Sequence, residues 1–372
     1  MPERLLVEGD ASTKIIHAVS GSVVTSLAGG VLSPAKDLIV QVGTAGGVTA
    51  VRGVDLDSLP MLKVDLDGTW ALPGAYGAAP SGFSPNGRWL VLVSRAPGQS
   101  TFAVIDAARS KLAAVVKLGD RFAFDAIHND GSAMYLIEHP VAGSTAYNVR
   151  LYDLRANSLT PDIIFDKSQI AQFDPTVGLM DGTFHVSVAP TVGDWSFGLY
   201  MRPNGTPFVH ALNVPGRYAT CIIDLAGKWT AASRFSMALA DDGRRLYVVD
   251  ATTGAASAID TQTQKVILRS TFAGRPADSD TRSATAVVSK DGAQVFASGE
   301  RGVAMLRSAD LSLIRWAATD LAIRSLAASA DGTRVYALAG DTVHVISIAT
   351  GLETQSYAAM SGARAIHLLP VP

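Results

Sequence analysis

The chain alternates short apolar runs with tight polar phrases that end in glycine. The runs are rich in valine, leucine, isoleucine and aromatic residues, which predicts buried β-strands. Asn-Gly and Asp-Gly favour turns that need a positive φ, so each phrase predicts the corner between two antiparallel strands. The six phrases are Ser84-Pro85-Asn86-Gly87, His128-Asn129-Asp130-Gly131, Leu179-Met180-Asp181-Gly182, Ala240-Asp241-Asp242-Gly243, Ser289-Lys290-Asp291-Gly292 and Ser329-Ala330-Asp331-Gly332.

The corner phrases recur at the spacing of a structural repeat. Successive corner glycines are 44, 51, 61, 49 and 40 residues apart. Each interval is the length of one four-stranded antiparallel blade, so the sequence predicts an all-β fold, a single β-propeller. An aromatic residue follows four of the glycines by four positions, and we expect it to pack between blades: Tyr135, Tyr247, Phe296 and Tyr336.

The two ends of the chain predict how the fold closes. Ser33-Pro34-Ala35-Lys36 aligns with the first phrase and gives a seventh corner. Residues 1–30 hold three strand-like runs without an inner partner, and residues 363–372 hold one run, Ala365 to Leu369, without the other three. One blade built from both ends would leave no exposed edge. We therefore predict eight blades, with seven as the alternative, in one domain of residues 1–372 whose closing blade combines 1–30 with 363–372.

Composition narrows the classes of partner and compartment. The chain has 31 basic and 33 acidic residues, so no global charge attracts nucleic acid, and we expect no nucleic-acid partner. The sequence contains no run of 18 apolar residues, so it predicts no membrane insertion. The chain as written is expected to be soluble. The single Cys221 excludes an internal disulfide framework but leaves the compartment open: cytoplasmic, or extracytoplasmic after loss of a leader or anchor. Oligomeric state is not predicted.

Two segments carry a resemblance to a known group of proteins. They are Leu246-Tyr247-Val248-Val249-Asp250 with Ala258-Ile259-Asp260-Thr261, and Ser289-Lys290-Asp291-Gly292-Ala293-Gln294-Val295-Phe296. The chain resembles the bacterial β-propellers built from YVTN-type repeats, which include lactonase-like enzymes, quinoprotein dehydrogenase subunits and surface proteins. The motif encodes the blade, so the resemblance implies a fold and carries over no catalytic residue. The Trp-Asp dipeptide of WD40 blades is absent from the sequence.

Metal and nucleophile signatures are weak. The seven histidines lack the spacing of zinc ligands, and Asp65-Leu66-Asp67-Gly68 occurs once without the other acidic ligands of a calcium loop. We expect no metal and no cofactor. Cys221, His210 and Asp224 could form a nucleophile, base and orienting acid, but strand alternation places Cys221 and Asp224 on opposite faces. A half-buried hairpin is the favoured interpretation, and the sequence leaves open whether the protein is an enzyme, with a non-enzyme favoured.

A set of arginines forms the candidate binding site. Each falls just before an inner strand, where the repeat would place it at one rim of the propeller: Arg121, Arg234, Arg282, Arg324 and Arg364, with Arg217 and Arg275 in the same class of loop. Guanidinium groups bind carboxylates and phosphates through several donors at once. The alternative is that local ion pairs neutralise them, because Asp120, Asp280 and Asp320 precede three of them closely.

These observations favour a non-catalytic binding or interaction propeller. Its ligand or partner site is expected at the mouth formed by the loops that join the outer strand of one blade to the inner strand of the next. An anionic small molecule or a protein partner would bind there. One alternative is a lactonase-like or other hydrolase that uses the same mouth. Another is a structural soluble module of a membrane-attached bacterial protein.

Overall fold

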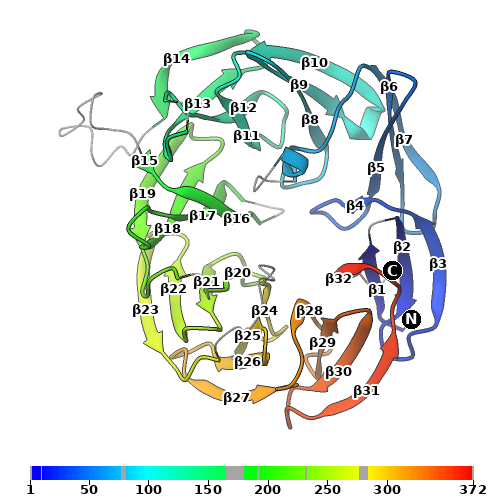
Figure 1. The fold of residues 1–372 in the computed structure, drawn as a ribbon, viewed down its shortest axis with the longest axis vertical. Helices are drawn as coiled ribbons and strands as arrows, with labels where there is room; N and C mark the ends of the chain where they lie inside the picture. The colour runs from blue at the N-terminus through cyan, green and yellow to red at the C-terminus, as the bar shows by residue number, and fades with distance from the viewer. Residues whose placement is uncertain are drawn as a thin grey trace. The chain divides into compact units, whose positions relative to one another are not determined.

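The computed structural model describes residues 2–9, 11–76, 81–141, 143–164, 180–190, 193–230, 233–275 and 284–370. They form antiparallel strands with two short 3₁₀ turns, η1(Pro73–Tyr76) and η2(Ala107–Arg109). The strands make eight sheets that are the blades of an eight-bladed, all-β propeller, as the sequence predicts. Strand labels are those of Figure 1. None of the helical segments in these ranges has the length and apolar character of a transmembrane span.

One compact unit comprises residues Met1–Gly30, Gly205–Pro207 and Asp224–Pro372 and holds four of the sheets. The first is β32(Ala363–Leu368), β1(Arg4–Gly9), β2(Ser12–His17) and β3(Val23–Ala28). The others are β20(Phe235–Leu239), β21(Arg245–Asp250), β22(Ala255–Asp260) and β23(Lys265–Thr271); β24(Ala286–Val288), β25(Gln294–Gly299), β26(Gly302–Arg307) and β27(Leu313–Ala317); and β28(Ile323–Ala328), β29(Arg334–Ala339), β30(Thr342–Ser347) and β31(Glu353–Ala358).

A second compact unit comprises residues Val31–Asn204 and Phe208–Ile223. Its first two sheets are β4(Val31–Leu32), β5(Ile39–Ala45), β6(Val48–Val54) and β7(Pro60–Asp67), and β8(Trp89–Ala96), β9(Gln99–Asp106) and β10(Lys111–Leu118). The other two are β11(Phe122–Ile127), β12(Ala133–Glu138), β13(Ala146–Asp153) and β14(Ser158–Ile164), with β15(Met180–Asp181) on β13, and β16(Thr183–Val188), β17(Trp195–Met201), β18(Pro207–Asn213) and β19(Tyr218–Asp224). A single domain over residues 1–372 stays a prediction.

The closing blade is confirmed by strand pairing. β1 pairs with β2 on one side and with β32 on the other, with Leu6 opposite His367 and Val7 opposite Ile366. The N- and C-terminal strands therefore lie side by side in one sheet (Figure 1). Leu5, Val7 and Ile366 are buried in one core cluster with residues of the β28–β31 blade, so closure buries apolar surface as well as backbone hydrogen-bonding groups.

Blades pack through the aromatic positions of the repeat. Tyr135, Tyr247, Phe296 and Tyr336 are each at most 1% exposed, and each belongs to a core cluster that spans two neighbouring sheets. Tyr135 also donates a hydrogen bond to the Val214 carbonyl, and Tyr336 donates one to Glu3. Each bond joins two neighbouring blades of its own unit, which confirms a packing role for these side chains.

The corner phrases other than the one that ends at Gly182 form the expected turns. Gly332 has a φ of +70°, and Ser329 Oγ donates to Asp331 Oδ1 at 2.7 Å while accepting from the Arg334 amide at 2.9 Å. In the degenerate first corner Lys36 takes the glycine position with a φ of +59°. The turn therefore depends on the serine and on the left-handed residue.

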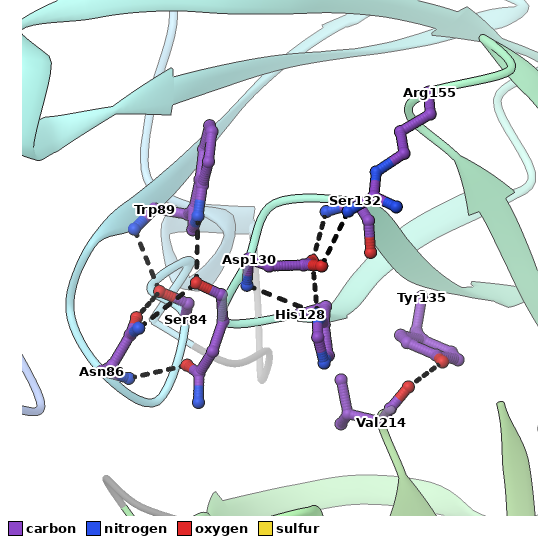
Figure 2. Close-up of polar contacts among 10 residues, drawn as sticks. Ser84, Asn86, Trp89, His128, Asp130, Ser132, Tyr135, Arg155 and Val214 are labelled. Atoms are coloured by element: carbon purple, nitrogen blue, oxygen red, sulfur yellow. Dashed lines mark hydrogen bonds and ion pairs between the residues drawn. The ribbon is translucent and has the colours of Figure 1, made fainter. Parts of the chain in front are cut away.

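Two neighbouring corners are also bonded to one another (Figure 2). Asn129 Oδ1 accepts from the Asn86 amide at 2.9 Å, and the Asn129 carbonyl accepts from Trp89 Nε1 at 3.2 Å. Asp130 accepts from the Ser132 amide and from Arg155 and is bonded to His128 Nδ1. His128 therefore has the turn-capping role that its corner position suggests.

One predicted corner is wrong. Gly182 does not have a positive φ and joins β15 to β16, whereas the hairpin partners β16 and β17 end at Val188 and begin at Trp195, respectively. A Cβ at Gly182 would lie 2.8 Å from Phe208 Cε1, so this glycine is required by close packing rather than by a turn.

Candidate functional site

The inner strands of two neighbouring blades carry β-bulges. In β11 the pairing with β12 skips Asp125, and in β16 the pairing with β17 skips His185. A bulge places one extra residue in a strand, bends it, and redirects the side chain of that residue. Asp125 and His185 are thereby released from the regular alternation of their strands.

Two cavities of the second unit meet at these bulges. The smaller, of about 310 Å³, is lined by Phe124, Asp125, His139, Thr183, Phe184 and Tyr200, among others. The larger, of about 480 Å³, is lined by Asp125, Phe184, His185 and Phe83 with several serines and small apolar residues. Asp125 and Phe184 line both. The smaller cavity lies at the starts of β11 and β16, the end of the blades at which outer strands connect to inner strands.

Asp125 has no protein partner among the residues that the structure describes. Within the described residues its carboxyl makes no hydrogen bond and no ion pair, and the side chain is only partly exposed. Burial raises the pKa of this carboxyl to about 7, because a charged carboxylate is poorly solvated there. The site thus holds an acid that would gain from a bound donor or cation.

An aromatic stack backs the smaller cavity. Tyr200 stacks on Tyr147 at 4.9 Å between ring centroids and on Phe208 at 5.5 Å, and Phe184 meets it edge-on. His210 lies 6.0 Å from the Tyr200 ring and is 4% exposed. Among the described residues, Tyr147 Oη and His210 Nε2 are buried without a hydrogen-bond partner. Burial lowers the pKa of His210 to about 4, so this imidazole is neutral at physiological pH.

Three of the predicted arginines are held by carboxylates. Arg121 pairs with Glu138 at 2.9 Å, Arg217 with Asp153 at 3.5 Å, and Arg234, only 3% exposed, with Glu300 at 2.8 Å. These contacts favour the bridging interpretation for these three residues. The carboxylates that pair with them are not the preceding aspartates: Asp120 and Asp320 make no such pair within the described residues, and Asp280 lies outside them.

The remaining arginines differ in their surroundings. Arg275 donates to the Arg301 carbonyl and lies over the Trp316 ring at 4.9 Å. Arg324 and Arg364 are exposed and are the bulge residues of β28 and β32. These two strands are linked through Ser325 Oγ, which accepts from the Ile366 amide at 3.1 Å. Arg282 lies outside the described residues, and anion binding by this set stays a prediction.

The alternative catalytic hypothesis gains no geometric support. His210 is buried in the aromatic stack, whereas Asp224 is exposed at the end of β19, and the side chain of Cys221 lies outside the described part of the structure. No group of three or more His, Cys, Asp and Glu side chains in the described ranges is arranged to hold a metal ion.

Comparison with known proteins agrees on the fold. No protein-family model matches the chain, and no curated protein matches its sequence. Apo AztD from Citrobacter koseri is 12% identical with a TM-score of 0.63, over 99% of this chain and 98% of that one. Dihydro-heme d1 dehydrogenase NirN in complex with DHE is 13% identical with a TM-score of 0.56, over 98% and 74%. The Dos1 propeller is 13% identical with a TM-score of 0.53, over 89% and 83%. These structures share the fold alone.

Proposed function

We propose that this protein is a non-catalytic β-propeller that binds a small molecule in the two cavities that meet at Asp125. The observation that carries the proposal is the carboxyl of Asp125, which lies on a β-bulge, lines both cavities and has no partner in the described part of the chain. Folding alone gives no reason to place a carboxyl in the apolar run Phe122–Ile127, because it costs stability there without a partner. A ligand that supplies the missing partner accounts for it.

The cavities have the features of a ligand site. Their volumes suit one small molecule, and their walls combine the inner strands β11 and β16 with other strands and loops of the same unit. Apolar and aromatic side chains supply contact area, and Asp125, His139 and Thr183 supply polar groups that would orient a ligand. Pre-formed walls of this kind reduce the ordering cost of binding.

Hydrolysis is the second candidate, and the raised pKa of Asp125 favours it. A carboxyl that titrates near neutral pH can serve as a general acid or base. We rank it below binding because, within the described residues, no hydrogen bond joins Asp125 to a nucleophilic side chain. Turnover of aliphatic lactones that is lost in Asp125→Asn would reverse this ranking.

A blocked variant tests the proposed function. Thr183 is exposed at the start of β16 and lines the smaller cavity, so Thr183→Trp should fill it without disturbing the core. Thr271→Trp, at an exposed strand end of the other unit, is the matched control. In a ligand-observed NMR screen of small metabolites, binders should lose their signal change with Thr183→Trp and keep it with Thr271→Trp. Binders that are unaffected by Thr183→Trp would contradict the assignment.

A further inference from the structure

The charge around the smaller cavity is one-sided. Asp125 is the one carboxyl among the described residues that line it, and this lining includes His139 but no lysine or arginine. The nearest basic side chain in the sequence, Arg121, is paired with Glu138, and Arg202 lies over the Phe208 ring at 4.5 Å. An anion in this cavity would face an uncompensated carboxylate.

The walls add a second property. Phe124, Phe184 and Tyr200 line the cavity, and Tyr200 is held by the stack with Tyr147 and Phe208. Aromatic faces attract cations and cover their carbon atoms, and the attraction is stronger where water is excluded. A carboxylate beside a packed aromatic wall therefore complements a group that is both positive and partly apolar.

We propose that the smaller cavity binds an organic ammonium ion, with the positive nitrogen at Asp125 and the carbon skeleton against Phe184 and Tyr200. This inference rests on the proposed function and narrows it to one ligand class. A volume of about 310 Å³ admits a single small amine rather than a peptide or a polymer. The hydroxyls of Ser144, Thr145 and Thr183 line the same cavity and can accept the remaining N–H groups.

A neutral polyol fits less well. The Ser144, Thr145 and Thr183 hydroxyls could bond the hydroxyls of a sugar as donors or acceptors, but a neutral sugar would leave the charge of Asp125 without a counter-charge. A cation, in contrast, restores the ionised state of Asp125 that burial disfavours. The distinction between a charged and a neutral ligand is therefore the property to test.

Three probes of one shape separate the ligand classes: benzylammonium, benzyl alcohol and benzoate, measured by titration calorimetry at about pH 8, where Asp125 is ionised. Benzylammonium should bind at least about tenfold more tightly than the other two. Asp125→Asn should lower its affinity to that of benzyl alcohol and leave benzyl alcohol unchanged. Asp120→Asn, which removes the same charge from an exposed position just before β11, should change neither.

Lower pH supplies a second readout. Affinity for benzylammonium should fall up to about tenfold per pH unit below the pKa of Asp125, and Asp125→Asn should lose this dependence. The groups that face Asp125 are Tyr135, Tyr147 and Tyr200, which stay protonated, together with His139 and His185 on the cavity walls. His139→Gln and His185→Gln should retain the pH dependence. A dependence that is lost with a histidine variant and kept with Asp125→Asn would overturn the assignment to Asp125.

The outcomes separate this inference from the proposed function. Equal affinity for benzylammonium and benzyl alcohol, both lost in Thr183→Trp, would overturn the ammonium proposal. It would still support the cavity as a ligand site. Preferred binding of benzoate would do the same and would favour an anionic ligand. No binding of benzylammonium up to about 10 mM overturns the ammonium proposal, and the metabolite screen then decides the proposed function alone.

Discussion

Asp125 and Asp130 are five residues apart in one blade, and their surroundings are opposite. Asp130, in the corner, is bonded to His128, Ser132 and Arg155 (Figure 2). Burial alone would raise the pKa of Asp130, but the hydrogen bonds from Ser132 and His128 outweigh it and hold the pKa far below its ordinary value. Asp125, on the bulge, makes no such bond within the described residues, and burial raises its pKa to about 7.

The difference distinguishes a structural acid from a binding acid. The repeat places acids equivalent to Asp130 at several corners, including Asp291 and Asp331, where each accepts from a nearby serine. Asp125 stands at the bulge of an apolar inner strand, where the equivalent bulge residues of β16, β28 and β32 are His185, Arg324 and Arg364. An acid that the fold satisfies contributes to stability, and one that the fold leaves unsatisfied is available to a ligand.

The largest effect is expected at the corner itself. A Cβ at Gly131 would lie 2.2 Å from the Trp89 ring, whose Nε1 is bonded to Asn129, and the φ of Gly131 is +72°. Gly131→Ala should cost about 3 kcal/mol of unfolding free energy, from strain and overpacking together. Gly292→Ala, with a φ of +71° and open space for the methyl group, should cost about 1 kcal/mol. If denaturant unfolding gave equal losses of unfolding free energy for the two variants, the contact with Trp89 would not contribute to the cost of Gly131→Ala.

Replacing Asp125 or Asp130 with asparagine should change the unfolding free energy in opposite directions. The folded-state pKa of Asp125 is above the ordinary 3.8, so its contribution is fully present below about pH 3.8 and is lost as pH rises through 7. At pH 8 Asp125→Asn should therefore stabilise the protein by about 2 kcal/mol, with little change near pH 4.

Asp130→Asn should instead destabilise, by about 1 kcal/mol at neutral pH. The value is small because the Asp130 side chain is 44% exposed and solvent screens its ion pair with Arg155. Thermal unfolding of Asp125→Asn and Asp130→Asn at pH 8 and near pH 4 checks both predictions. Destabilisation by Asp125→Asn at pH 8 would show that the carboxylate has a structural partner.

The buried histidine behind the cavity should make the protein acid-sensitive. The pKa of His210 is lowered from 6.5 to about 4, so its contribution to stability is fully present above pH 6.5 and is lost as pH falls through 4. At pH 5 His210→Phe should be more stable than the parent by about 1 kcal/mol, relative to their difference at pH 7.5. His344→Phe, at a histidine paired with Glu353, is the control. A pH profile unchanged by His210→Phe would contradict the burial argument.

The arginines should contribute least to stability. Replacing the exposed Arg324 and Arg364 together with Gln should change the unfolding free energy by no more than about 0.5 kcal/mol. If they bind anions, affinity for inorganic phosphate should be salt-sensitive in the parent and weaker in the double variant. A phosphate affinity that the double variant retains would end the anion prediction for these two positions.

The sequence predicted the repeat but not the site. Corner glycines, the following aromatic residues and the shared closing blade come from local rules of turn conformation and strand pairing, so they are visible in the chain. Gly182 misled the corner assignment because an Asp-Gly pair can serve close packing as well as a turn.

Asp125 and His185 could not be placed in advance, because a bulge depends on the register of two strands. The available signal was the composition of one strand. Phe122-Ala123-Phe124-Asp125-Ala126-Ile127 contains a single charged residue in an otherwise apolar run. Pairing of Arg121, Arg217 and Arg234 with carboxylates distant in the chain was likewise set by the packing of strands rather than by sequence neighbours.

Direct titration of the two carboxyl groups tests the central claim. Carbon-detected NMR of aspartate-labelled protein, with Asp125→Asn and Asp130→Asn to assign the signals, would follow both side chains over pH. The account predicts that Asp125 titrates near 7 and that Asp130 remains ionised well below its ordinary pKa of 3.8. An Asp125 midpoint close to 4 would contradict the account, because the carboxyl would then have the solvation or the partner that a ligand is proposed to supply.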